Sequence, residues 1–286
     1  MLCLGPFLAR VGVFFSEKFK GRSWPIIGDR FRDFPEAFGE LLNHPDFTLY
    51  EPKPVSEELL AKVHSRRLLE TVRAAWHYEG ARLTVGACVE ALEKIWTGEI
   101  NSAVVLSVAA GHHAGPDNAW GGTYLSSFGP AILNLKEKHG VRRFAILDTD
   151  SHHADGDRAM FRGNPNILHV CFCGFNRVEE GGLKVDVDVG WRTTDEAYLK
   201  LVEEEFLRRA EAFKPEAVLH SLGYDTCQGD YGDRGLTPAF FPRLVAKVKA
   251  FTDRVCGGRY LIAIMGGSNP QTASLIIPEM VRVLLS

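Results

Sequence analysis

The sequence contains no apolar run long enough to form a membrane-spanning helix, which needs about 20 residues, so we expect no membrane partner. It also contains no Cys-x-x-Cys pair, which argues against a zinc ribbon. A chain of 286 residues that is 45% hydrophobic can stabilise a core without disulfides, so we expect reduced thiols and a cytoplasmic location. The segment 1–15 lacks the basic start of a signal peptide, and we interpret residues 9–15 as a first strand. The six cysteines are scattered, at positions 3, 88, 171, 173, 227 and 256.

The net charge of −3 is small, and it gives no reason to expect nucleic-acid binding, which depends on clustered Lys and Arg. The length allows one large α/β domain or two small ones. We find no repeat, low-complexity tract or linker in the sequence. The sequence therefore favours a single domain over residues 1–286.

Strand patterns alternate with helix patterns along most of the chain. Short β-rich runs occur at 101–108, 144–147, 167–172, 217–222 and 260–265. Helical spacing of apolar residues occurs at 35–42, 55–78, 83–96, 196–213, 237–255 and from 271 to the terminus. The segment 117–138 begins Gly-rich and becomes helical towards Leu135 and Lys138. This alternation predicts an α/β fold with a mostly parallel central sheet and helices on both faces.

The most informative stretch runs from Phe144 to Asp157, where four apolar residues are followed by a cluster of acids and histidines. The apolar part predicts a buried parallel strand, and ligands of α/β sheets bind beyond the carboxyl ends of such strands. Asp150 and His152 are two residues apart, so both point the same way in an extended segment. A carboxylate and an imidazole together form half of a zinc or manganese site.

Two other predicted strands also end in polar residues. His112 and His113 follow the first of them, and Asp225 follows the second. Because parallel strands end at a common edge of the sheet, Asp225 can join Asp150 and His152 in a three-ligand metal site. Three protein ligands leave a position for water and substrate, as in catalytic zinc sites. The two histidines would then act as bases, and a carboxylate such as Asp148 or Asp155 would hold a histidine tautomer.

These segments resemble the signature segments of the zinc-dependent histone deacetylases, a superfamily that includes acetylpolyamine amidohydrolases and acetoin-utilisation proteins. The order and spacing of the segments match, as does the Gly-Gly after the last strand. A segment from Gly28 to Leu42 and the short segment Val63-His64-Ser65 resemble two further family elements. The three main segments are Gly111-His112-His113-Ala114, Asp148-x-Asp150-x-His152-His153-x-Asp155-Gly156 and Gly223-Tyr224-Asp225.

The resemblance implies the arginase/deacetylase-like fold and a role for each matched residue. One zinc per chain would be held by Asp150, His152 and Asp225. His112 and His113 would move protons to and from the attacking water and the leaving amine. Asp148 would be the carboxylate partner of His112, and Asp155 the partner of His113. Asp148 and the backbone of Cys171–Phe172 would hold a structural potassium ion. Gly121 and Gly122 would line the tunnel that admits the acyl-lysine.

The main departure from the family is at the last strand, where Ser268 occupies the position of a tyrosine whose hydroxyl polarises the substrate carbonyl. The second tunnel position, Gly122, is usually aromatic, and Trp120 or Tyr124 could substitute for it. Loss of an oxyanion donor typically costs about 10²–10³ in turnover. The sequence therefore predicts weak activity on acetyl groups even though the metal site is complete.

Three functions are consistent with these residues. The leading hypothesis is a zinc-dependent hydrolase that removes an acyl group from an amine, whether acyl-lysine, acyl-polyamine or a small acylated amine. The first alternative is a catalytically weakened acyl-lysine binder or scaffold that keeps the zinc site. The second is a two-manganese ureohydrolase, which needs more bridging carboxylates than the strand ends supply. The sequence specifies neither the amine nor the oligomeric state.

Overall fold

The computed structural model describes residues 10–21 and 28–286, and these residues form a nine-stranded sheet. The strand order is β2-β1-β3-β9-β8-β4-β5-β7-β6, and every neighbouring pair is parallel except β6 and β7. The predicted α/β class with a mostly parallel sheet is confirmed. The strands are β1 (Val11–Phe14), β2 (Phe47–Tyr50), β3 (Ser102–Leu106), β4 (Phe144–Asp148), β5 (Ile167–Cys173), β6 (Arg177–Glu179), β7 (Lys184–Asp188), β8 (Ala217–Leu222) and β9 (Tyr260–Ile264).

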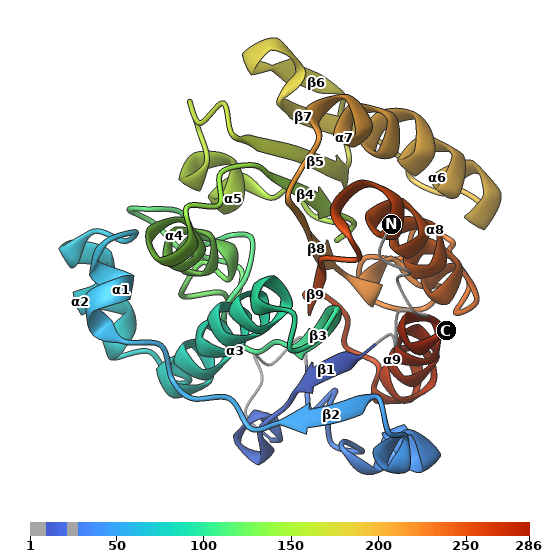
Figure 1. The fold of residues 1–286 in the computed structure, drawn as a ribbon, viewed down its shortest axis with the longest axis horizontal. Coiled ribbons are helices and arrows are strands. Elements are labelled where there is room, and N and C mark those ends of the chain that lie inside the picture. The colour runs from blue at the N-terminus through green and yellow to red at the C-terminus, as the bar shows by residue number, and fades with distance from the viewer. Residues whose placement is uncertain (1–9, 22–27) are drawn as a thin grey trace, which may run out of the picture.

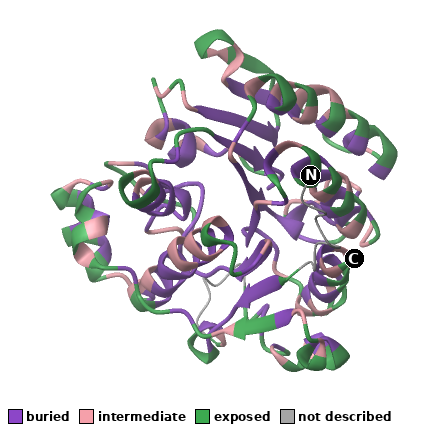
Figure 2. Cartoon of the chain, in the orientation of Figure 1, coloured by how far each residue is buried: buried purple, intermediate pink, exposed green. Residues whose placement is uncertain are grey.

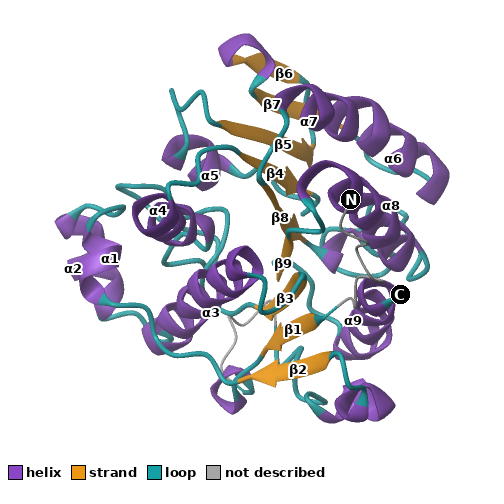
Figure 3. Cartoon of the chain, viewed as in Figure 1, coloured by secondary structure: helices purple, strands orange, loops and turns teal. Residues whose placement is uncertain are grey.

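Helices cover both faces of the sheet, with α1 to α5 on one side and α6 to α9 on the other (Figures 1 and 3). Within the described residues, no helix is long and apolar enough to cross a membrane. The helices are α1 (Glu57–Ala61), α2 (Arg66–Arg73), α3 (Tyr78–Thr97), α4 (Phe128–His139), α5 (Asp155–Met160), α6 (Asp195–Leu201), α7 (Arg208–Phe213), α8 (Phe240–Cys256) and α9 (Pro270–Leu285).

The sheet is buried on both faces, and it separates two apolar layers of the core (Figure 2). Strand β3 shows the division, because Val104 and Leu106 pack into one layer while Ala103 and Val105 pack into the other. Successive strand side chains point to opposite faces, so a strand that is covered by helices on both sides is mostly apolar. This is why the central strands are recognisable in the sequence as continuous apolar runs.

Several predicted helices differ from the observed ones at their ends. The helix expected at 196–213 is continuous from α6 to α7, with a π-helical turn at Val202–Leu207 between them. The helix expected at 35–42 is a 3-10 helix over Glu36–Asn43, interrupted at Gly39 by a φ of 53°. Helix α4 begins only at Phe128, after a loop that contributes to the site. The first strand was expected from position 9, which lies outside the described residues.

The carboxyl ends of β3, β4, β8 and β9 lie at one edge of the sheet, and the loops that follow them carry the polar residues singled out above. Because β8 pairs with both β4 and β9, the loops after these three strands begin side by side. The sheet topology therefore brings together residues that are far apart in the sequence.

Candidate metal and catalytic site

The three predicted metal ligands lie together beyond β4 and β8. Ligand atoms of Asp150, His152 and Asp225 all lie within 4.8 Å of one another. His152 Nδ1 is 2.9 Å from Asp150 Oδ1 and 3.3 Å from Asp225 Oδ2. Two carboxylates and an imidazole form a donor set that suits zinc.

Both carboxylates of this set are buried, and burial disfavours two negative charges close together. Burial and the charge of Asp150 raise the pKa of Asp225 to about 6. Burial also opposes the ionisation of Asp150, but His112 and His152 outweigh it and lower the pKa of this carboxyl. Hydrogen bonds that His152 donates to Asp150 and Asp225 raise the pKa of His152 to about 10. In the protein without an ion, protonated His152 therefore supplies the positive charge that the two acids require.

The backbone at Gly266 packs directly against these two acids. A Cβ atom on Gly266 would lie 2.5 Å from Asp150 Oδ2 and 2.7 Å from Asp225 Cγ, so no side chain fits at this position. The Gly266 N–H also donates a hydrogen bond to Asp150 Oδ2, at 2.7 Å. The buried carboxylates of Asp150 and Asp225, together with the His152 imidazole and next to Gly266, form a site that fits a divalent ion.

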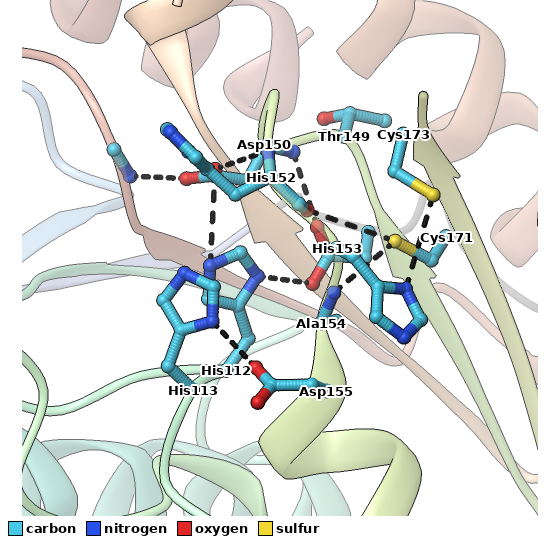
Figure 4. A network of polar contacts seen from close by, with 12 residues as sticks. His112, His113, Thr149, Asp150, His152, His153, Ala154, Asp155, Cys171 and Cys173 are labelled. Atoms are coloured by element: carbon cyan, nitrogen blue, oxygen red, sulfur yellow. Dashed lines mark hydrogen bonds and ion pairs between the residues drawn. The ribbon is translucent and has the colours of Figure 1, made fainter. Parts of the chain in front are cut away.

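His112 and His113 lie beside this set, each held by its own carboxylate (Figure 4). His112 Nδ1 donates to Asp148 Oδ2 at 2.9 Å, and His113 Nδ1 donates to Asp155 Oδ1 at 2.7 Å. The His112 Nε2 atom is 3.7 Å from Asp150 Oδ1. The structure thus pairs the two histidines with the acids in the order implied by the family resemblance.

The two histidines differ in charge. Although burial opposes the charged form, Asp148 and Asp150 raise the pKa of His112 to about 10. Burial, followed by the positive charge of His112, lowers the pKa of His113 below its usual value of 6.5. At neutral pH the pair therefore holds one proton donor and one neutral base.

A pocket opens above these residues, and Gly121 and Gly122 line it together with Trp120. The Trp120 indole N–H donates to Asp155 Oδ2 at 2.7 Å, and its ring lies 4.1 Å from the His113 ring, centroid to centroid. A Cβ on Gly121 would lie only 2.8 Å from His113 Cδ2, which explains glycine there. Tyr124, the other aromatic residue considered from sequence, is not among the residues that line this pocket.

Ser268 is held away from the pocket by Asp230. Its hydroxyl donates to Asp230 Oδ1 at 2.8 Å, and its backbone N–H donates to Asp230 Oδ2 at 3.0 Å. The backbone N–H of Asn269 also donates to Asp230 Oδ2, at 3.1 Å. Ser268 does not line the pocket, and its catalytic role stays a prediction.

Tyr231 presents a hydroxyl to the pocket instead. Its ring lies 5.8 Å from the His152 ring, and its hydroxyl oxygen accepts a hydrogen bond from the Gly267 N–H at 3.1 Å. A methyl group on Gly266 would be 2.8 Å from this oxygen and 2.5 Å from Asp150 Oδ2, so the hydroxyl and the acid pair border the same small space. Burial, followed by the charges of Asp225 and Asp150, raises the pKa of Tyr231, which keeps the hydroxyl protonated.

Arg30 supports the loop on which this arrangement depends. Its side chain is buried and is among the residues that line the pocket. The guanidinium donates to the carbonyl oxygens of Met265, Ser107 and Gly267, the last at 3.1 Å. Arg30 thereby joins the ends of β3 and β9 and fixes the backbone that contacts Asp150.

Sequence reasoning missed the positions of Tyr231 and Arg30 in the site. Tyr231 lies six residues after Asp225 in a Gly-rich loop, which gives no periodic pattern to interpret. Arg30 falls in the 28–42 segment that resembles a family element, and the sequence gives no indication of its role. Cys171, expected near a potassium ion, has its Sγ 3.8 Å from the His152 carbonyl oxygen. The potassium site stays a prediction.

Comparisons with known proteins agree on one protein family. The model of the histone deacetylase domain matches residues 76–284. The histone deacetylase-like amidohydrolase of Pseudomonas aeruginosa is 29% identical over 244 residues, covering 75% of this chain and 64% of that protein. The polyamine deacetylase HDAC10 of Mus musculus is 28% identical over 229 residues, covering 72% of this chain and 33% of that protein. The chain thus spans less than two thirds of the length of these curated relatives.

A solved structure extends the agreement to the fold. The crystal structure of the HDA15 HD domain superposes with a TM-score of 0.84 at 23% identity, covering 97% of this chain and 90% of that chain. At this identity the likeness concerns the fold alone. Because the family model covers most of the chain, this protein belongs to the histone deacetylase domain family.

Proposed function

We propose that this protein is a zinc-dependent hydrolase that removes an acyl group from an amine. The observation that carries the proposal is the convergence, on one pocket, of a three-ligand set with two histidine–carboxylate pairs. The names of the relatives, an amidohydrolase and a polyamine deacetylase, support the same reaction class. An acyl-lysine, an acyl-polyamine and a small acylated amine are all consistent with this chemistry.

Asp150, His152 and Asp225 would hold the zinc. When bound, zinc supplies a Lewis acid that polarises the acyl carbonyl and makes water easier to deprotonate. Since the metal must displace the proton from His152, binding should be coupled to proton release. Three protein ligands leave room for substrate, as expected for a catalytic rather than a structural zinc.

The proton transfers would be carried out by the two histidines. Neutral His113 has Nδ1 occupied by Asp155, so its Nε2 is the atom that would accept a proton from the attacking water. His112 is charged and would donate its Nε2 proton to the leaving amine. Asp148 and Asp155 fix the two ring orientations and tautomers.

Tyr231 would supply the hydroxyl that the family places at the position of Ser268. The Tyr231 oxygen already accepts from Gly267, so its own hydrogen remains available to a substrate oxygen in the pocket. A donor aimed at the developing oxyanion is worth about 10²–10³ in turnover. This assignment argues against the scaffold alternative, because a pure binder needs neither this hydroxyl nor the two histidine pairs.

The direct test is a screen of purified protein against acyl-lysine and acyl-polyamine substrates of several acyl lengths, with and without a zinc chelator. We expect hydrolysis of at least one class, loss of turnover with the chelator, and recovery when zinc is returned. The scaffold alternative would be favoured if protein with zinc in this site hydrolyses none of the substrates, activated trifluoroacetyl amides included.

Replacing Asp225 by asparagine should remove zinc from the pocket and abolish turnover. The substitution keeps the side-chain size but removes the negative charge that balances the ion, so zinc affinity should fall by at least about tenfold. Zinc content after dialysis, measured by elemental analysis, is the primary measurement. Asp253→Asn, on the exposed face of α8, is the matched control and should keep both zinc and activity. A wild-type zinc content in Asp225→Asn would contradict the ligand assignment.

The pH dependence of kcat/KM should show the loss of one proton from His113. Because burial and His112 lower the pKa of His113 below 6.5, the group is charged only on the acid side of that value. Activity should therefore be low in acid, rise as pH increases through the lowered pKa, and be level by neutral pH. Measurements between about pH 5 and 8 test this. A flat profile, with chemistry limiting the rate, would exclude His113 as the base.

A further inference from the structure

We infer that His153, Cys171, Cys173 and Asp186 form a second metal site, separate from the pocket, that suits zinc and serves a structural role. The four residues come from three elements. Cys171 and Cys173 lie on β5, Asp186 lies on β7, and His153 lies on the loop after β4. No residue is shared with the set formed by Asp150, His152 and Asp225.

The sheet explains why these four side chains meet. Cys171 and Cys173 are two apart on one strand, so both point to the same face. Strands β5 and β7 are parallel neighbours, and Cys171 is directly opposite Asp186 in the register. Figure 4 shows the His153 ring beside the two sulfur atoms, away from His112 and His113.

The distances between the ligand atoms suit a tetrahedral ion. His153 Nδ1 is 3.2 Å from Asp186 Oδ1 and 3.9 Å from Cys173 Sγ. All four ligand atoms lie within 4.8 Å of one another. Zinc bonds of 2.0–2.3 Å place the ligands of a tetrahedral site about 3.3–3.8 Å apart, so only small movements are needed.

The charges and the surroundings also favour a thiophilic divalent ion. The side chains of Cys171, Cys173 and Asp186 are buried, and thiolate with imidazole is a donor set that selects zinc. A dication with two thiolates and one carboxylate carries one net negative charge. Arg158 compensates this charge, since it is buried and donates to Asp186 Oδ1 at 2.7 Å and to Oδ2 at 3.2 Å. A ligating carboxylate that is itself hydrogen-bonded is the usual arrangement at metal sites.

A closed set of four protein ligands leaves no position for substrate, which marks a structural rather than a catalytic ion. This ion would bind the loop after β4 to β5 and β7 through His153. The same loop carries Asp150 and His152, so the second site would stabilise the loop that holds the first. The protein would then hold two metals at separate places, whereas the sequence predicts one zinc per chain.

Cobalt(II) distinguishes the two sites, because only a cysteine-containing site gives thiolate-to-cobalt charge-transfer absorption in the near ultraviolet. Metal-free wild-type protein, kept reduced with a phosphine, would be titrated with cobalt and then with zinc. We expect two bound equivalents, one of which produces the charge-transfer band, and loss of that band when zinc displaces cobalt. The titration measures binding rather than turnover, so it is independent of the proposed hydrolase activity.

Four variants assign the band. Cys171→Ser combined with Cys173→Ser should lose the band and one equivalent, and His153→Ala should weaken cobalt binding at the band-producing site. Asp225→Asn should keep the band and lose the other equivalent. Cys256→Ser is the matched control, since Cys256 is also buried but contacts the Arg259 carbonyl oxygen, and it should keep both.

The wild-type spectrum alone can overturn the inference, even when a cysteine variant fails to fold. Absence of the band at two equivalents of cobalt would show that these side chains form a metal-free ion-pair network around Asp186. A disulfide between Cys171 and Cys173 in purified protein that persists under the reducing conditions, detected by mass spectrometry, would equally exclude the site. A band that survives the double cysteine substitution would place the thiolate ligand elsewhere.

Discussion

Tyr231→Phe is expected to lower kcat for an acetylated amine by about 10²–10³, the loss typical of one oxyanion donor. The substitution removes one oxygen atom and preserves the ring that faces His152. KM and zinc content should change little, because the lost interaction is made mainly in the transition state. Steady-state kinetics and elemental analysis of the same preparation measure both quantities.

The acyl group provides an internal control for this prediction. A trifluoroacetyl amide has an electron-poor carbonyl that needs less help from a donor, so Tyr231→Phe should slow it much less than the acetyl analogue. A trifluoromethyl ketone, whose hydrate resembles the tetrahedral state, should also bind more weakly to Tyr231→Phe than to the wild type. This binding measurement is independent of turnover.

Ser268 provides the competing assignment from sequence. If Tyr231 is the donor, Ser268→Ala should leave the preference between acetyl and trifluoroacetyl substrates unchanged. Ser268→Tyr should bring no gain, since Asp230 holds the backbone and hydroxyl of this residue. If instead Ser268→Ala lowers acetyl turnover while Tyr231→Phe does not, the sequence-based assignment is right and the role of Tyr231 is wrong.

The sequence predicts the fold where burial makes it simple. The central strands β3, β4, β5, β8 and β9 were all found, because helices cover both faces and most of their positions are apolar. Strand β7 was missed, although its alternation of charged and apolar residues is a pattern typical of a strand. Its Lys184 and Asp186 are buried, with Lys184 donating to the Ile167 carbonyl oxygen at 2.7 Å and Asp186 paired with Arg158. Hydrophobic periodicity does not show charges that are satisfied inside a protein.

The short strands β2 and β6 were missed for a different reason. Both lie at edges of the sheet, and their residues are mostly exposed or half-buried. Edge strands have one neighbour and need little apolar surface, so a run of three or four residues carries no clear pattern. These strands do not contribute to the site, and the site could be predicted without them.

The sequence predicts the residues of the site better than it predicts their surroundings. Asp150, His152 and Asp225 directly follow strands or lie within a few residues of one, so topology alone brings them together. Tyr231 and Trp120 lie farther along irregular loops, where the direction of a side chain depends on turns that no periodicity describes. The sequence offers Trp120 as a tunnel residue, but its hydrogen bond to Asp155 follows only from the folded loop.

Replacing His113 by glutamine should lower kcat by about 10²–10⁴ while zinc stays bound, the range expected for a lost general base. Glutamine keeps a polar side chain against Trp120 but cannot take up a proton, so the acid limb of the pH profile should disappear as well.

Asp155→Asn should cause a smaller loss of kcat than His113→Gln, because it acts by misorienting His113. The double variant should be hardly slower than His113→Gln, since both changes disable one unit. His139→Gln, at the end of α4, is the matched control. A His113→Gln variant that keeps the wild-type rate and the acid limb of the pH profile would require a different base. Equal losses of kcat in the two single variants that add in the double variant would show that Asp155 acts independently of His113.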